Sequence, residues 1–323
     1  MLKSHLENSV ADFVNNLNNN PGKPIYELSP QQARNVLLSV QTPSQQNSLL
    51  QTMELNIPLP NNRSIRTQII YPPKNSDNLP VIFYIHGGGW VMGNEVTHQH
   101  LVYNLATMTP AIIIFPIYTP SPEAQYPQTT QDLFSTLQFL PQIAEEYNLN
   151  LDNLCVAGDS VGGNMATVMA LMAKQNNNYP KIKFQLLLYP VTASNFNTAS
   201  YQEYAYGPWL TKKAMEWFWH QYAPNQQSRQ EIYASPLQAK IEDLQGLPPT
   251  LIITDENDVL RDEREEYARK LDKAGVEVYN VRINGTIHDF MMLNALAESR
   301  PTQIAMNIAT SYLQKFLHHN LSS

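Results

Sequence analysis

The sequence contains a single cysteine, Cys155, among its 323 residues. One thiol can form neither an intrachain disulfide nor a cysteine-based zinc site, so neither cross-link is expected to hold this fold together. Residues 154–157 around it are apolar, and we interpret Cys155 as a buried, inert side chain. The fold must therefore be stabilised by its core.

Long apolar runs and basic clusters are also missing. No stretch approaches the roughly 20 apolar residues of a membrane span, and the start, MLKSHLENSVADFV, is polar where a signal peptide needs an apolar core. The net charge is −7, and no cluster of lysine and arginine provides a phosphate-binding surface. We expect a cytoplasmic protein that acts on a small molecule, without a nucleic-acid partner or integral membrane association. The oligomeric state is open, and a homodimer is one expectation.

The order of the predicted elements indicates an α/β protein. Hydrophobic residues make up 43% of the chain and charged residues 15%, which is typical of a globular protein with a large core. Apolar β-type runs alternate with helical stretches, a pattern that predicts a mostly parallel sheet with helices on both faces. The runs are residues 81–85, 111–117, 154–157, 183–189, 250–254 and 276–283, the helical stretches are 98–108, 129–147, 161–174 and 262–274, and a hairpin of 54–59 and 65–71 precedes them.

Two further regions are expected to cover one end of the sheet. Residues 6–17 and 30–40 are predicted helices, and we interpret the apolar face of the first as packing on its own domain and not on a membrane surface. About 60 residues rich in aromatics, with a helical stretch at 211–222, separate Tyr189 from Pro249, which is too long for a loop. We therefore predict one domain, residues 1–323, with a helical cap formed by about residues 1–50 and about residues 193–235.

The sharpest motif is Gly158-Asp159-Ser160-Val161-Gly162. It lies between an apolar strand and a helix, the context in which a G-x-S-x-G serine is held as a nucleophile on a tight turn. The helix N-terminus behind the serine favours negative charge there. A glycine turn with Ser160 as a bystander is the alternative, but this pattern is expected by chance only about 0.03 times in such a chain. Ser160 is therefore the predicted nucleophile.

A second glycine cluster, His86-Gly87-Gly88-Gly89-Trp90, follows the run at residues 81–85. Six of the 12 glycines fall in residues 86–90 and 158–163, which indicates backbone that must approach another group closely. The N–H groups of this loop and that of Val161 can hold an oxyanion above Ser160. Phosphate binding is disfavoured because neither G-x-G-x-x-G nor G-x-x-x-x-G-K-[ST] is present, and we expect no cofactor and no metal. His86 is interpreted as a structural residue of the loop.

The base is expected to follow the serine and the acid in the chain. Four histidines come after Ser160: His220 lies in the presumed cap helix, and His318 and His319 lie in a polar C-terminal tail. His288 follows the last β-type run in a loop that contains a glycine, and it is the predicted base. The rate should therefore fall on acidification, with a midpoint within a unit or two of about 6.5.

The acid should leave the strand at residues 250–254. Asp262 and Glu263 fit the first turn of the next helix, where acidic side chains complement the dipole. Asp255 is nearest the strand and could instead satisfy loop amides. Spacing alone does not separate Asp255 from Asp258.

Four motifs together resemble the hormone-sensitive-lipase-like branch of the α/β-hydrolases, over nearly the whole chain. Residues 86–90, 158–163, 258–263 and 285–290 are similar to its H-G-G-G-[WF], G-D-S-A-G-G, D-x-L-x-D-E and G-x-x-H-x-F motifs. The resemblance implies an α/β-hydrolase fold and a serine carboxylesterase that hydrolyses short- to medium-chain esters through an acyl-enzyme. It also implies that Asp258 is the acid and that Gly88, Gly89 and Val161 donate to the oxyanion.

Departures from the family pattern bear on the substrate pocket and on one ion pair. Val161 replaces the usual alanine and is expected to narrow the acyl site at the pocket floor. Residues 118–123 lack the arginine of the family's Y-R-L-A-P-E, so a supporting salt bridge is expected to be missing. The candidate substrate-binding residues are the bulky rings Trp90, Trp209 and Trp217.

Two other functions compete with an esterase. A binding protein on the same fold is disfavoured because receptors that resemble this family have lost the histidine, whereas this chain retains His288. An amidase or peptidase would use the same nucleophile, so the sequence does not decide between ester and amide.

Overall fold

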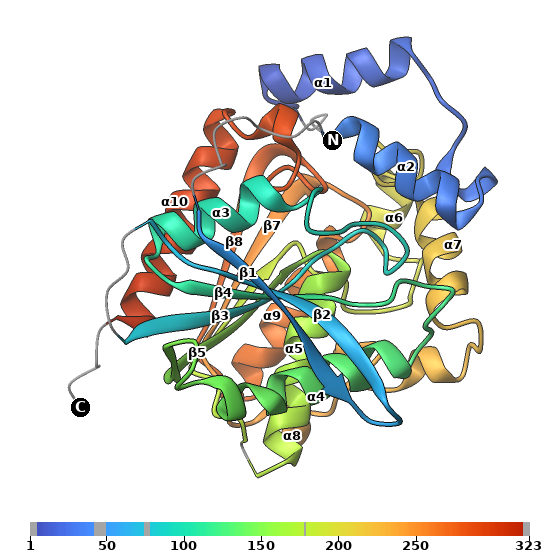
Figure 1. Ribbon diagram of the computed structural model, residues 1–323. Coiled ribbons are helices and arrows are strands. Elements are labelled where there is room, and N and C mark those ends of the chain that lie inside the picture. Colours follow the sequence, from blue (N-terminus) through green and yellow to red (C-terminus); the bar gives the residue numbers. More distant parts are fainter. Residues whose placement is uncertain (1–4, 42–49, 74–77, 178, 319–323) are drawn as a thin grey trace.

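The computed structural model describes residues 5–41, 50–73, 78–177 and 179–318, which fold around one eight-stranded sheet (Figure 1). The strand order is β1-β2-β4-β3-β5-β6-β7-β8. β2 pairs antiparallel with β1 and β4, and all other neighbours are parallel. The strands are β1 (Thr52–Leu59), β2 (Arg63–Ile70), β3 (Leu79–Ile85), β4 (Ile112–Ile117), β5 (Leu149–Asp159), β6 (Phe184–Leu188), β7 (Thr250–Asn257) and β8 (Val278–Ile287). The predicted mostly parallel sheet is confirmed.

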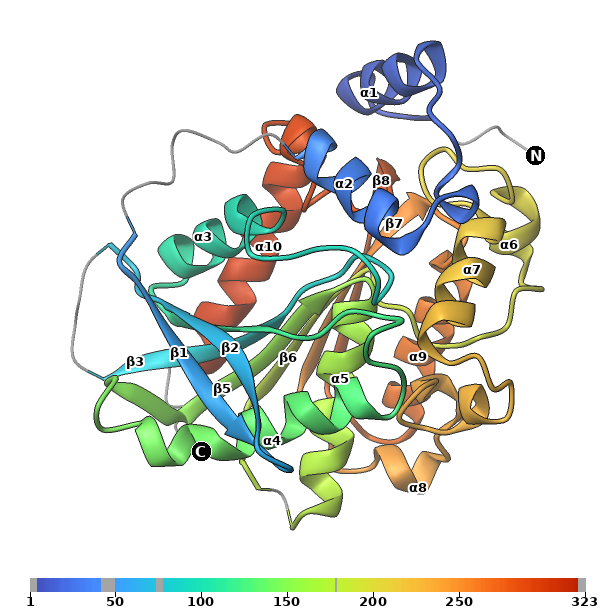
Figure 2. The ribbon, with the colours of Figure 1, turned by 45° about the vertical axis from the view of Figure 1, so that its right-hand side comes forward.

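Helices cover both faces of the sheet. α3 and α10 lie on one face, and α4, α5 and α9 lie on the other (Figures 1 and 2). Every residue of β3 and β6 is buried, which explains their uninterrupted apolar sequences. The helices are α1 (Asn8–Asn19), α2 (Pro30–Val40), α3 (Gln99–Met108), α4 (Gln128–Ile143), α5 (Val161–Gln175), α6 (Ala199–Glu203), α7 (Lys212–Tyr222), α8 (Ile241–Leu244), α9 (Arg261–Lys273) and α10 (Arg300–Leu317), with short 3-10 turns such as η1 (Ile25–Glu27). None of the described helices is long and apolar enough to cross a membrane.

The last helix, α10, is absent from the sequence prediction. Its N-cap Ser299 accepts a hydrogen bond from the backbone of Thr302, and Ala305, Ala309 and Leu313 repeat along its buried face. Both signals are in the sequence, where no element is predicted for residues 300–317 and only His318 and His319 are placed in a polar tail. His318 caps this helix and its Nε2 contacts the backbone oxygen of Thr109, while His319 lies outside the described residues.

The predicted cap segments gather at one end of the sheet. α2 lies beside α7 in both views, with α1 above α2 at the same end (Figures 1 and 2), and Phe13 on α1 packs against Trp209 between α6 and α7. Residues 1–4 and 42–49 of the predicted cap lie outside the described residues. In the sheet below, Cys155 on β5 is fully buried as predicted, and burial raises the pKa of its thiol. This end of the sheet also carries Ser160, directly after β5.

Candidate active site

Ser160 occupies the turn between β5 and α5 with φ 52° and ψ −120°. A residue other than glycine rarely adopts a positive φ, so the surroundings must hold this turn. The backbone N–H of Ser160 donates to the oxygen of Leu188 at 2.9 Å. Gly162 is required because a Cβ there would lie 2.0 Å from the oxygen of Ile85 on β3. The predicted strand–turn–helix is thus confirmed, and it places Ser160 beside the glycine loop.

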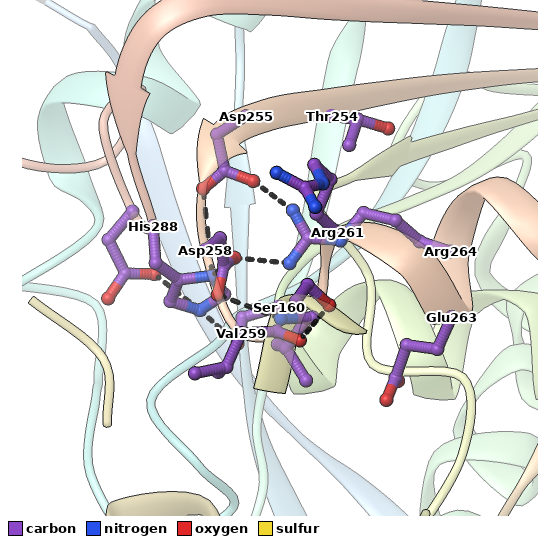
Figure 3. A network of polar contacts seen from close by, with 12 residues as sticks. Ser160, Thr254, Asp255, Asp258, Val259, Arg261, Glu263, Arg264 and His288 are labelled. Atoms are coloured by element: carbon purple, nitrogen blue, oxygen red, sulfur yellow. Dashed lines mark hydrogen bonds and ion pairs between the residues drawn. The ribbon is translucent and has the colours of Figure 1, made fainter. Parts of the chain in front are cut away.

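Three of the sequence-predicted residues meet above this turn (Figure 3). His288 Nε2 lies 2.8 Å from Ser160 Oγ, and its Nδ1 lies 2.6 Å from Asp258 Oδ2. Asp258 Oδ1 also accepts the backbone N–H of Leu260 at 3.1 Å. When Nδ1 donates its proton to the carboxylate, Nε2 is left as an acceptor for the serine hydroxyl. This is the arrangement that a general base and a serine nucleophile require.

The carboxylates around His288 change its proton affinity. Burial alone lowers the pKa of His288, but Asp258, Asp289 and Asp255 outweigh burial and raise that pKa to about 9. Burial alone raises the pKa of Asp258, but Arg264 and His288 outweigh burial and hold it well below its usual value. The histidine therefore titrates higher than the ordinary value of about 6.5 that the sequence suggests.

We expect kcat/KM to fall as the pH is lowered, with a midpoint above about 6.5 and toward the raised pKa of His288. Only neutral His288 can accept the serine proton, and a raised pKa keeps it protonated to higher pH, so the rate rises as pH passes upward through that pKa. The measurement is kcat/KM for p-nitrophenyl acetate at constant ionic strength, with background hydrolysis subtracted. A rate that stays flat from neutral pH to about pH 4 excludes a histidine base.

The second candidate acid, Asp255, lies farther from the histidine. Its nearest carboxylate oxygen is 3.9 Å from His288 Nδ1, against 2.6 Å for Asp258. Among the described residues, Asp255 contacts the buried guanidinium of Arg264 and accepts no loop amide, so the alternative role in binding loop amides is wrong. Burial, together with the negative charge of Asp258, raises the pKa of Asp255 to about 7 against the lowering effect of Arg264.

The two acidic residues predicted at the start of α9 do lie in its first turn. Glu263 is buried, however, and its Oε1 accepts the backbone N–H groups of Thr192 and Ala193 at 2.6 and 3.0 Å. Burial raises the pKa of Glu263 to about 8. Glu263 therefore fastens α9 to the segment after β6.

The glycine loop after β3 faces Ser160. Gly88 and Gly89 have φ values of +103° and +64°, and both line the same cavity as Ser160 and His288. A Cβ on Gly89 would lie 2.2 Å from the ring of Phe218, so only glycine fits under α7. Within the described chain, the backbone N–H groups of Gly88, Gly89 and Val161 donate to no protein acceptor. These N–H groups remain available to an oxyanion.

Asp159, next to the serine, anchors this loop and was missed as a functional residue. Its Oδ1 accepts the N–H of Gly87 at 3.0 Å and the hydroxyl of Tyr84 at 2.6 Å, and its Oδ2 lies 3.2 Å from His98 Nε2. Burial alone raises the pKa of Asp159, but His98 outweighs burial and lowers it. His86 bonds within the loop as predicted, with Nδ1 2.8 Å from the oxygen of Gly87. Burial and the nearby His98 lower the pKa of His86 to about 3, so it stays neutral.

Residues 118–123 lack the family arginine, but Glu123 in this segment forms a salt bridge with an arginine from another element. Arg34 on α2 donates to both carboxylate oxygens of Glu123, at 2.9 and 2.6 Å. Arg34 also donates to the backbone oxygens of Val91 and Ser121, at 2.8 and 3.0 Å. Arg34 lies 89 residues before Glu123 in the sequence, and its contacts tie α2 to the segment that follows the glycine loop.

A cavity of about 240 Å³ opens above Ser160. Its apolar walls come from α1, η1, α2 and the segment around α7, and include Leu17, Ile25, Leu37, Leu210, Met215 and Phe218. Of the three predicted tryptophans, only Trp209 lines it, and its Nε1 donates to Asp289 Oδ2 at 2.9 Å. The predicted apolar cover over Ser160 is therefore present, and Trp209 is part of it.

The other pocket predictions need correction. Trp90 is fully buried and stacks on Tyr222 at 4.2 Å, which places it among core rings outside the cavity lining. Trp217 packs against Phe218 and does not line the cavity either. Val161 is fully buried in the first turn of α5 and is absent from the lining, so its side chain does not form the pocket floor.

The residues Asp255, Asp258 and His288 are also a group with metal-ligand chemistry, because their ligand atoms lie within 4.8 Å of one another. Arg264 contacts both carboxylates, so a protein cation already compensates their charge. The two carboxylates are thus better suited to hold the His288 imidazole than to bind a metal ion.

Known proteins are similar to this chain over most of its length. Residues 82–292 match a family model described as alpha/beta hydrolase fold. A thermostable esterase from Pseudomonas putida ECU1011 has 43% identical residues and a TM-score of 0.94, covering 97% of this chain and 98% of its own. The carboxylesterase NlhH of Mycobacterium tuberculosis is 33% identical over 83% of this chain and 85% of its own length. A putative alpha/beta hydrolase R526 of Acanthamoeba polyphaga mimivirus is 41% identical over 96% of this chain and 88% of its own length.

Proposed function

The chain belongs to the hormone-sensitive-lipase-like carboxylesterase family of the α/β-hydrolases, and from that membership we propose that it cleaves carboxylic esters with Ser160 as the nucleophile. It is a carboxylic ester hydrolase whose substrates are small-molecule esters. The observation that carries the assignment of residues is the hydrogen-bonded series from Ser160 through His288 to Asp258. Relatives named as an esterase and as an ethyl acetate hydrolase support an ester, and not an amide, as the substrate of this chain.

In the proposed mechanism, Ser160 Oγ attacks the ester carbonyl carbon while His288 Nε2 accepts the hydroxyl proton. Asp258 stabilises the imidazolium through Nδ1–H. The carbonyl oxygen becomes an oxyanion facing the N–H groups of Gly88, Gly89 and Val161. Collapse expels the alcohol, which takes the proton from His288 and leaves an acyl-enzyme. Water then attacks the acyl group with His288 as base, releasing the carboxylic acid and free Ser160.

Oxyanion stabilisation accounts for a large part of the expected rate. Removing a single donor of this kind costs about 10²- to 10³-fold in other serine hydrolases. Two of the three proposed donors belong to the loop that Asp159 and Arg34 anchor. The loop anchors therefore support catalysis without touching the substrate.

We further propose that about residues 1–50 and about residues 193–235 act as a cap that sets the acyl-chain length. The apolar cavity favours an acyl chain by about 0.8 kcal/mol per buried methylene until it is full. Its volume of about 240 Å³ supports acyl groups of about two to eight carbons, which makes the protein an esterase of short- to medium-chain esters.

A cytoplasmic location and a homodimer remain predictions, to be tested by cell fractionation and by light scattering.

We expect kcat/KM for p-nitrophenyl esters to rise with acyl length from acetate, peak by about eight carbons and fall well before palmitate. Leu17→Trp adds volume to the cavity wall on α1 and should move the peak to shorter chains, with little change for acetate. Leu38→Trp is the matched control, because Leu38 on α2 is 36% exposed and outside the cavity lining. The matched p-nitroanilides should react far more slowly.

Palmitate as the best substrate contradicts the proposed limit. An unchanged profile in Leu17→Trp contradicts the part of the cap formed by α1. Either result leaves the assignment of Ser160, Asp258 and His288 intact, because these residues form the reacting centre and not the chain-length wall.

A further inference from the structure

A fully buried arginine, Arg264 on α9, extends toward Asp255 and Asp258 (Figure 3). One guanidinium nitrogen contacts Asp255 and the other contacts Asp258. Its Nε has no partner among the described residues. An arginine is almost never fully buried unless it is paired, and breaking such a pair leaves an uncompensated buried charge. Its place is therefore explained by the two carboxylates.

The net charge of the group formed by Asp255, Asp258, Arg264 and His288 changes when His288 is protonated. Asp255, Asp258 and Arg264 together carry one net negative charge when both carboxylates are ionised. Asp258 Oδ2 serves both Arg264 and His288 Nδ1. When His288 accepts the serine proton, the imidazolium brings the four buried groups to neutrality. Without Arg264, His288 would face two uncompensated carboxylates at the same step.

We propose that Arg264 and Asp255 are a positioning pair for the base, in which Arg264 cancels the charge of Asp255 and holds Asp258 against His288. This inference rests on the proposed function, since the pair acts only through His288. It goes beyond the Ser160, His288 and Asp258 assignment because it gives the second aspartate a role. The competing interpretation is that the pair merely fastens α9 to β7.

Other titratable groups near His288 and Arg264 are left unsubstituted in every variant. Asp289 Oδ1 lies 3.4 Å from His288 Nε2, and the ring of Tyr189 lies 5.3 Å from the imidazole. Burial raises the pKa of Tyr189 well above its ordinary value, so it stays neutral. Glu263 lies next to Arg264 on α9 and is also buried. Differences among variants of the pair therefore report on Asp255 and Arg264.

The test is a charge cycle of Arg264→Met, Asp255→Asn and the double variant, read as the acid-side midpoint of kcat/KM. Arg264→Met leaves two carboxylates that favour the imidazolium, so the midpoint should rise by about one unit. Asp255→Asn leaves Arg264 uncancelled and disfavours the imidazolium, so the midpoint should fall by about one unit. The double variant restores one net negative charge and should return close to wild type.

Activity and folding controls separate this role from a structural one. The double variant should be about tenfold more active at pH 8 than Arg264→Met alone, since one pKa unit changes the neutral fraction tenfold. Arg264→Lys keeps the charge and should keep the midpoint. Arg63→Met is the matched control, because Arg63 forms a two-bond pair with Asp132 elsewhere and should not move the midpoint. Rates are divided by active sites titrated with an organophosphate.

Unchanged midpoints in the single variants overturn the inference, as does a double variant less active than Arg264→Met. If Arg264→Met does not fold, Asp255→Asn and the double variant still decide through their midpoints. A wild-type protein without esterase activity refutes the proposed function itself. An active wild type whose pair variants show no opposite shifts refutes the positioning pair alone.

Discussion

Replacing Ser160 with alanine is expected to lower kcat for ester hydrolysis by about 10⁴-fold or more. In the described chain, Ser160 carries the only hydroxyl hydrogen-bonded to His288 Nε2, so no neighbouring group can form the acyl-enzyme in its place. The residual rate should come from the oxyanion donors and the apolar cavity, which remain. The measurement is kcat for p-nitrophenyl acetate with purified protein whose fold is checked by circular dichroism.

The control for this substitution is Ser235→Ala. Ser235 is fully buried, and its hydroxyl has no partner among the described residues, so its removal should change kcat by less than about twofold. Near-wild-type turnover in folded Ser160→Ala would end the assignment of the nucleophile. An equal loss in both variants would point to a general effect on the fold.

Asp258→Asn is expected to cost about 10⁴-fold in kcat, far more than Asp255→Asn. An asparagine at 258 removes the carboxylate 2.6 Å from His288 Nδ1. The imidazole then loses the acceptor that keeps its proton on Nδ1 and the negative charge that stabilises its protonated form. The substitution also leaves Arg264 with one carboxylate fewer. Both variants are measured at the plateau of their own pH profiles, so that a shifted midpoint is not mistaken for a lost catalytic group.

Asp255→Asn is the matched control, because Asp255 lies near the end of β7 and its replacement removes the same charge from the same arginine. Its carboxylate lies 3.9 Å from His288 Nδ1, so its plateau rate should stay within about tenfold of wild type. The reverse order, with Asp255→Asn the more damaging, would show that the family pattern had been carried onto the wrong aspartate.

The sequence predicts those parts of the site that lie in short segments with demanding backbone geometry. The turn at Ser160 and the glycine loop belong to this class, because their glycines are needed for close approach and positive φ. The choice between Asp255 and Asp258 could not be made by spacing, because the pairing of β7 with β8 shifts register between Asp255 and Asn257. Which carboxylate reaches His288 depends on that irregularity.

Contacts between segments far apart in the chain could not be predicted from the sequence. Arg34 meets Glu123 across 89 residues, and His98 meets Asp159 across 61. No local pattern marks such partners, because each is chosen by how two elements pack. The aromatic rings show the same limit, since Trp209 reaches the cavity while Trp90 is directed into the core. Helix α10 is a different case, because its N-cap residue and the spacing of its apolar residues could have been recognised in the sequence.

The most direct test of Ser160 as the nucleophile is the site labelled by a serine-directed organophosphate, found by peptide mass spectrometry alongside the loss of activity. We expect one label per chain on the peptide that contains Ser160, a loss of activity in proportion to labelling, and no label in Ser160→Ala. A label on another serine, or full esterase activity after complete labelling of Ser160, would contradict this expectation.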